Sequence, residues 1–116
     1  MTIPTVEALV AAIEAAFRRR YESSETFRNA LKGKDRVIHL NVTDGEHWHL
    51  VVKDGNLVET ARGAPGKADV VITATTRDLL AVANREVHPV RAYMSGQVKV
   101  KAPLKDILVV KGFLGK

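Results

Sequence analysis

The stretch from Ala68 to Val100, ADVVITATTRDLLAVANREVHPVRAYMSGQVKV, decides the fold. Apolar side chains at every second position from 68 to 74 predict a strand with one face on a core. The helical spacing of the apolar residues from Leu79 to Ala83 predicts a helix. Pro89 suits the first turn of a second short helix, and Gly96 suits its left-handed end. The order is therefore strand, helix, helix, turn and strand, with no residue typical of a nucleophile or a metal ligand.

Length and composition predict a soluble globular protein with one domain, residues 1–116. Hydrophobic residues make up 46% and charged residues 27% of the chain. The sequence has no cysteine, which excludes disulfides, thiolate zinc sites and cysteine nucleophiles. No apolar run is long enough to span a membrane, and the N-terminus lacks the basic leader of a signal peptide. We therefore expect a cytoplasmic protein.

The net charge of +5 lies wholly in the last third of the chain. Residues 1–83 carry 11 basic and 11 acidic side chains, whereas residues 84–116 carry seven basic and two acidic ones. A solvated surface is one explanation, and contact with an anion such as a phospholipid head group, a carboxylate or a coenzyme A phosphate is the other. Nucleic acid is not expected as a partner, because aromatic residues make up only 5% of the chain and are not interleaved with the cations.

Two helices precede the central stretch. Apolar residues from Val6 to Phe17 follow the spacing of one helical face, so they predict an amphipathic helix. Ser23 or Ser24 can cap a short second helix that stops at Gly33.

The apolar period changes to two from Arg36, which predicts a hairpin of two strands around Asp44-Gly45. A three-residue loop, 44–46, places Val42 opposite Trp48 and gathers the apolar residues on one face. A loop two residues longer keeps the same face. In the next strand, residues 57–61, the pattern leaves open which set of side chains faces inward.

The C-terminal segment Pro103–Leu114 predicts a helix with more apolar residues than one stripe requires. Its polar side chains are only Lys105, Asp106 and Lys111. Such a helix packs against the protein on two sides, closes a cavity or contacts another molecule.

Residues able to do chemistry are few. His39, His47 and His49 share one face of the hairpin, and we expect that face to be solvated and not to hold a metal. Ser95 does not lie in a nucleophile elbow, and Gly63 and Gly66 do not form a phosphate-binding loop. We therefore expect no enzyme activity and no cofactor.

The run Ala92–Val100, AYMSGQVKV, together with the strand and helix before it, resembles the C-terminal signature of the sterol carrier protein type 2 family. The run Gly45–Gly55 is similar to the Trp-containing hairpin of that family. The resemblance extends from about Phe27 to Leu108. The chain departs from the family pattern at Ala102 and before the second short helix, where the family usually has glycine.

The resemblance implies an α+β sandwich in which about five helices cover one face of a five-stranded, mostly antiparallel sheet. It also implies an apolar tunnel between the two layers for a fatty acid, fatty acyl-CoA, phospholipid or sterol. The family binds and transfers lipids without catalysis, and it also occurs as an appended domain of larger enzymes.

We therefore expect a lipid-binding and lipid-transfer domain whose C-terminal helix closes the tunnel. The expected partners are a lipid or acyl chain and, transiently, an anionic membrane surface; the protein itself would be a monomer or weak dimer. A protein-interaction module that uses the apolar C-terminal helix is the alternative, and a small enzyme is a third possibility. The residues expected to line the tunnel are Trp48, Leu50, Ile72, Leu80, Met94, Val98, Leu104, Ile107, Leu108 and Phe113. The residues expected to meet a head group are Arg91, Lys99, Lys101 and Lys105.

Overall fold

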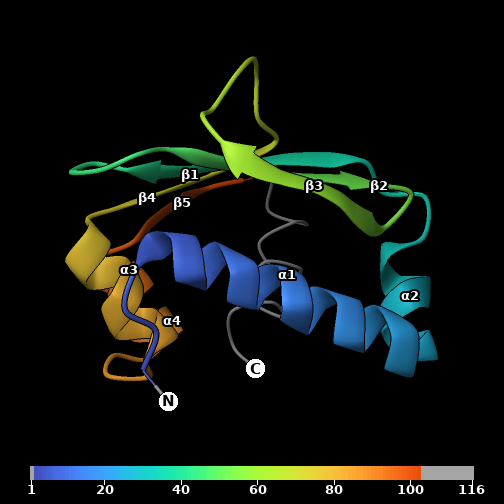
Figure 1. Cartoon of the computed structure of the whole chain (residues 1–116), viewed down its shortest axis with the longest axis horizontal. Coiled ribbons are helices and arrows are strands. Elements are labelled where there is room, and N and C mark those ends of the chain that lie inside the picture. The colour runs from blue at the N-terminus through green and yellow to red at the C-terminus, as the bar shows by residue number, and fades with distance from the viewer. Residues whose placement is uncertain (1, 103–116) are drawn as a thin grey trace.

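One sheet and the helices against one of its faces form the fold (Figure 1). A computed structural model of the chain describes residues 2–102. The elements in chain order are α1 (Val6–Ser23), α2 (Glu25–Leu31), β1 (Arg36–Val42), β2 (Trp48–Lys53), β3 (Asn56–Arg62), β4 (Val70–Ala74), α3 (Thr76–Ala83), α4 (Pro89–Met94) and β5 (Lys99–Lys101).

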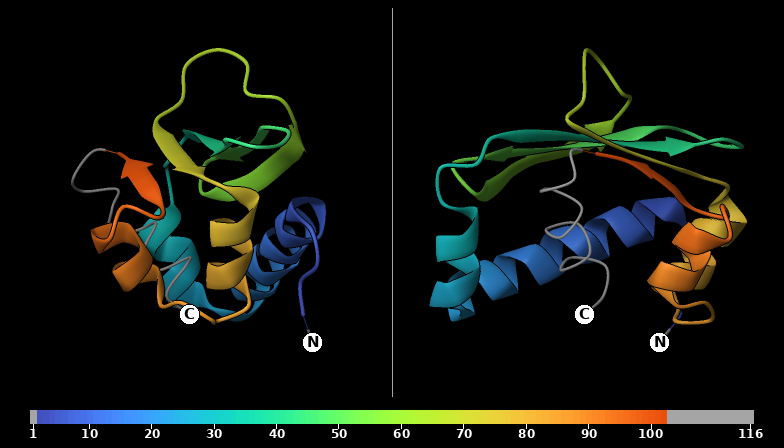
Figure 2. Two further views of the ribbon diagram at one scale, coloured as in Figure 1. Left: turned by 90° about the vertical axis from the view of Figure 1, so that its left-hand side faces the viewer. Right: turned by 180° about the vertical axis from the view of Figure 1, so that it is seen from behind.

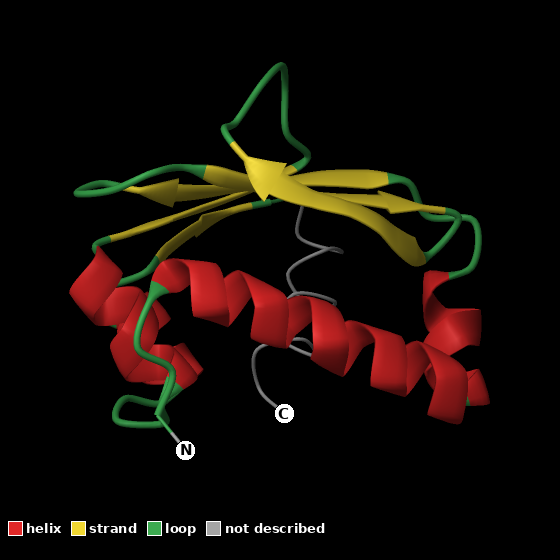
Figure 3. Cartoon of the chain, in the orientation of Figure 1, coloured by secondary structure: helices red, strands yellow, loops and turns green. Residues whose placement is uncertain are grey.

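Within residues 2–102, the sheet has five strands in the order β3-β2-β1-β4-β5. In this part of the chain β1 and β4 pair in parallel, and the other three pairs are antiparallel. All four described helices lie on the same side of the sheet, and the loop between β3 and β4 projects from the other side (Figures 2 and 3). The predicted α+β architecture with a mostly antiparallel sheet is therefore confirmed. A fifth helix was expected at Pro103–Leu114, which lies outside the described residues.

The register of β1 against β2 follows the longer of the two loops considered from the sequence. Leu40 lies opposite Trp48 and Ile38 opposite Leu50, two residues away from the register of the three-residue loop. Because a shift of two keeps every side chain on its face, the apolar residues still gather on the side of the helices.

A β-bulge in the β2–β3 pairing explains why the inward face of β3 could not be read from the sequence. The register shifts between Val51 and Val52, which pair with Glu59 and Leu57. Leu57 is buried in the core on one side of the bulge, and Thr60 on the other side donates a hydrogen bond of 2.8 Å to Glu14 of α1. An extra residue inverts the alternation of a strand, so residues of both parities face the helices.

The helix starts agree with the sequence signals. Thr5 and Thr75 are the N-caps of α1 and α3, and each accepts a hydrogen bond of 3.1 Å from a backbone N–H three residues later. Pro89 occupies the first turn of α4, and Gly96 follows that helix with a φ of +81°. These local signals set where the helices begin and end before any packing is considered.

Within the described residues, the apolar side chains between the sheet and the helices form two clusters. The first cluster joins the start of α1 to β1, β4, α3 and α4, and its buried members are Val10, Leu40, Val42, Ala74, Leu79, Ala92 and Val98. The second cluster joins the end of α1 to α2, β2 and β3, and its buried members are Phe17, Leu31, Leu50, Val52 and Leu57.

Two residues of α4 lie largely outside the core. Met94, which was expected to line the tunnel, is 80% exposed, and its neighbour Tyr93 is 47% exposed. The helix has only six residues, and it is Ala92 that faces the first cluster.

Replacement of Gly55 by alanine should destabilise the fold more than the same change at Gly33. Both residues have a positive φ, +76° and +79°, which costs alanine roughly 1–2 kcal/mol. A Cβ at Gly55 would also come within 2.5 Å of the carbonyl oxygen of Leu31, whereas a Cβ at Gly33 meets nothing within 4 Å. Denaturant unfolding of both variants measures the difference, and equal losses in the free energy of unfolding would contradict this account.

Candidate functional site

Four of the described residues that were expected to line a tunnel are buried or half-buried between the sheet and the helices. Leu50 belongs to the second cluster and Val98 to the first, and each is 6% exposed. Trp48 and Ile72 are half-buried and pack against the first cluster. The predicted set thus spans both clusters along the sheet.

The other predicted lining residues are less central or lie beyond the described part. Leu80 is half-buried on α3, and Met94 is mostly exposed on α4. The remaining four lie outside residues 2–102, namely Leu104, Ile107, Leu108 and Phe113.

A cleft of about 220 Å³ opens between the start of α1, the β1–β2 turn and the beginning of α3. Its floor includes Val6, Val42 and Trp48, which also belong to or pack against the first cluster. The cleft therefore leads from the surface to apolar side chains between the layers. Its remaining lining residues are Pro4, Thr5, Glu7, Gly45, Glu46, Arg62 and Thr76.

Arg62 is held over Trp48 at the edge of this cleft. Its guanidinium carbon lies 5.2 Å from the centre of the indole ring. The same guanidinium forms ion pairs with Glu7 at 2.5 Å and with Glu46 at 3.3 Å. Arg62 thus covers one face of an aromatic residue with a cation that two carboxylates hold in place.

The three described cations that were expected near a head group lie on two different elements, β5 and α4. Lys99 and Lys101 lie opposite Thr73 and Val71 of β4, and neighbouring Ile72 faces the first cluster. Both lysines therefore lie on the outer face of the sheet, away from the helices. Arg91 is exposed on α4, and Lys105 lies outside the described residues.

Arg62, the cation beside Trp48, was not among the residues predicted from the sequence. The sequence leaves the inward face of β3 open, and the register that follows from the bulge places Arg62 opposite Trp48.

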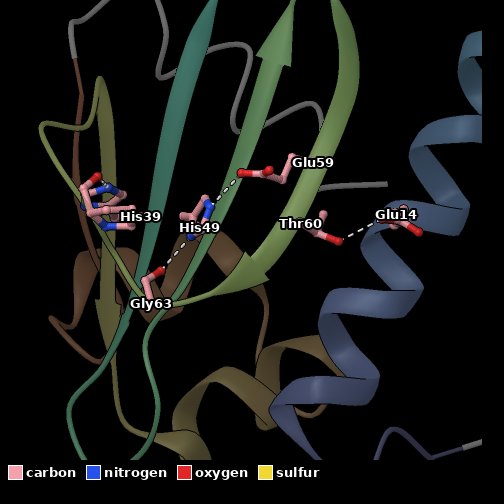
Figure 4. A network of polar contacts seen from close by, with 7 residues as sticks. Glu14, His39, His49, Glu59, Thr60 and Gly63 are labelled. Atoms are coloured by element: carbon pink, nitrogen blue, oxygen red, sulfur yellow. Dashed lines mark hydrogen bonds and ion pairs between the residues drawn. The ribbon is translucent and has the colours of Figure 1, made fainter.

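The expectation of a solvated histidine face is wrong for two of the three histidines. His39 and His49 are 6% and 8% exposed, beneath the loop that joins β3 to β4, and only His47 is exposed (Figure 4). The backbone oxygen of Gly63 and the carboxylate of Glu59 bond to His49 and raise its pKa, although burial acts in the opposite direction. Within residues 2–102, no three acidic or histidine side chains are grouped so that they could hold a metal ion.

Residues 13–114 match the model of the SCP-2 sterol transfer family. The chain belongs to this family. No curated protein matches the chain at a significant level. None of the helices between residues 2 and 102 is long and apolar enough to cross a membrane.

Solved structures share the fold of this SCP-2 chain at low sequence identity. Palmitated SCP2L2 from Aedes aegypti is 19% identical with a TM-score of 0.67, over 97% of this chain and 96% of that one. A structure of sterol carrier protein 2 is 21% identical with a TM-score of 0.61, over 89% and 87% of the two chains.

A larger protein contains the same fold as one part of its chain. An inverting sec-alkylsulfatase from Pseudomonas sp. is 24% identical with a TM-score of 0.58 over 77% of this chain. The match spans only 14% of the sulfatase. The fold therefore occurs both as nearly a whole chain and as a small part of an enzyme.

Replacement of Asp44 by alanine should destabilise the protein at neutral pH and matter less in acid. The backbone N–H and the hydroxyl of Thr76, at the start of α3, both donate to the Asp44 carboxylate, at 2.8 and 2.9 Å. These bonds lower the pKa of Asp44, and the bond from the backbone N–H has the larger effect. The ionised carboxylate therefore stabilises the fold at pH values above the ordinary aspartate pKa of about 3.9. That stabilisation is lost as the pH falls through the lower pKa of the folded state.

Thermal melting of the wild type and of Asp44→Ala, measured from neutral pH down into acid, tests the direction of this pH dependence. The difference in melting temperature should narrow as the pH falls. A difference that stays constant, or that widens in acid, would contradict the role of the ionised carboxylate.

Proposed function

We propose that this SCP-2 chain binds the acyl chain of a lipid between the sheet and the helices and transfers the lipid without catalysis. The observation that carries the proposal is the match to the SCP-2 sterol transfer family over residues 13–114. The similarity to palmitated SCP2L2 over nearly both chains supports a fatty acyl ligand. The apolar inner face, from Trp48 and Ile72 beside the first cluster to Leu50 in the second, would provide the contact surface.

Burial of the acyl chain would supply the affinity. Each buried methylene contributes roughly 0.8 kcal/mol, so a dozen contribute on the order of 10 kcal/mol before the cost of ordering. This contribution does not depend on a particular head group. The ligand class is therefore a lipid with a long apolar chain, such as a fatty acid, fatty acyl-CoA, phospholipid or sterol.

The segment 103–116 would close the site. Its apolar residues, Leu104, Ile107, Leu108 and Phe113 among them, exceed what one helix face against a core requires. The excess positive charge of residues 84–116, including exposed Arg91, Lys99 and Lys101, would favour transient contact with an anionic membrane during transfer.

A bulkier residue at position 72 should block the site. Ile72 is half-buried on the inner face, and its neighbour Val71 lies on the outer face of the same strand. Ile72→Trp should weaken the binding of a fluorescent fatty acid at least tenfold by filling space between the layers, and Val71→Trp should leave it within about twofold. Circular dichroism of both variants checks that they fold.

Delipidated wild-type protein should bind the fatty acid at micromolar concentration. Failure of the wild type to bind would refute the proposed function. Equal binding by the two variants would place the ligand elsewhere on the protein.

A charge within the C-terminal segment separates closure of the site from protein interaction. Leu108→Asp should weaken fatty-acid binding, because an unpaired carboxylate is costly against an acyl chain. Analytical ultracentrifugation should find the wild type and the variant equally monomeric. A wild-type dimer that the substitution dissociates, with lipid binding intact, would favour the interaction module.

A further inference from the structure

The two buried histidines on the outer face of the sheet face each other across neighbouring strands. His39 of β1 pairs with His49 of β2 in the sheet register. The strand order obliges the chain to cross both strands on its way from β3 to β4, and residues 63–69 make that crossing over the two rings (Figure 4). One nitrogen of each ring bonds to a backbone oxygen of this loop. His39 Nε2 lies 3.2 Å from the Pro65 oxygen, and His49 Nδ1 lies 2.9 Å from the Gly63 oxygen.

His49 has a second partner in β3. Its Nε2 lies 2.9 Å from a carboxylate oxygen of Glu59. A backbone carbonyl and a carboxylate only accept hydrogen bonds, so both ring nitrogens of His49 must donate. A neutral imidazole carries one N–H, and an imidazolium carries two. The contacts of His49 therefore require the charged ring.

The titratable and charged groups around His49 come from several elements. Glu59 approaches from β3 and His39 from β1, while exposed His47 precedes it on the loop side of β2. The crossing loop carries Lys67 and Asp69, and Asp69 accepts a hydrogen bond from the backbone N–H of Val37. Lys99 and Lys101 lie on the same face beyond β4.

Glu59 lies where its contact with His49 can hold the edge of the sheet in place. It lies beside the bulge, and among the described strands β3 is an edge strand with a neighbour on one side only. The next residue, Thr60, is tied to Glu14 of α1 on the opposite face (Figure 4). The edge strand is thus held from both faces at the point where its ladder is interrupted.

We infer that His49 is a pH-sensitive clasp that, as an imidazolium, ties Glu59 of β3 and the crossing loop together, and that opens when the ring loses a proton. This clasp is independent of lipid binding. In the neutral ring one nitrogen has no hydrogen, so its lone pair faces either the Gly63 oxygen or the Glu59 carboxylate at hydrogen-bond distance. Glu59 is the contact that is given up, because its side chain is 56% exposed and can turn to water.

The sign of the pH dependence follows from the two bonds. The Gly63 carbonyl and then Glu59 raise the pKa of His49 in the folded protein. The clasp therefore contributes fully to the free energy of unfolding at pH values below the ordinary histidine pKa of about 6.5. That contribution is lost as the pH rises through the pKa of His49 in the folded protein. Stability and protection of β3 should fall together over that range.

The test compares wild type with Glu59→Gln, which keeps the shape of the side chain. The amide nitrogen of the substituted side chain can donate a hydrogen bond to an unprotonated Nε2. The neutral ring can then satisfy both of its contacts, so the pKa of His49 should fall. Glu22→Gln, an exposed change on α1, is the matched control and should leave the His49 titration unaltered. Side-chain ¹⁵N spectra across the pH range from about 5 to 9 measure the protonation of both ring nitrogens.

The expected result for the wild type is a His49 ring that is protonated at both nitrogens at pH values where an unfolded histidine is already neutral. Amide exchange of β3 should quicken, beyond its intrinsic pH dependence, as that ring deprotonates, and this step should be lost in Glu59→Gln. A wild-type ring that is neutral below pH ~6.5, or the same titration in both proteins, would overturn the inference. If the variant does not fold, the wild-type spectrum alone still decides whether the His49 ring is protonated at both nitrogens.

Discussion

The parallel pairing of β1 with β4 is the constraint on which the rest of the structure depends. It places Val42 beside Ala74, both buried, and so joins the first three strands to the second half of the chain. A parallel pair cannot be closed by a tight turn. The chain must leave β3 at one edge, pass over two strands and enter β4 beyond them.

That route explains why the two faces of the sheet differ. The helices cover one face, where the apolar clusters lie, and the crossing loop covers part of the other. Buried polar side chains need hydrogen-bond partners, and the loop carbonyls provide them for His39 and His49. The sheet would therefore separate the lipid proposed between the layers from the charged histidine proposed on the outer face.

Much of the fold could be predicted from local signals and alternation. Caps, Pro89 and Gly96 set the ends of helices through contacts within a few residues, and the period of two identified the strands. The inward face of β3 could not be predicted, because a bulge depends on the partner strand. The burial of His39 and His49 was missed for a similar reason, since a loop far along the chain covers them.

The candidate site was predictable only in part. Trp48, Leu50 and Ile72 lie on the inner face of the sheet, as alternation indicated, and Val98 is buried in the first cluster just before β5. Arg62 escaped notice, and Lys99 and Lys101 fall on the other face, because charge counted along a chain does not identify the side of a sheet. Alternation relates neighbours in one strand, whereas the position of a cation relative to the layers depends on register across several strands.

The crossing loop also bears on the order in which the sheet assembles. The pairs β1–β2 and β2–β3 join strands that are adjacent in sequence, and closing them costs little chain entropy. The β1–β4 pair joins residues about 32 positions apart, such as Ile38 and Val70, and β5 has a place only after β4 is docked. We therefore expect the three-strand meander to form first and the β4–β5 half to add late in folding.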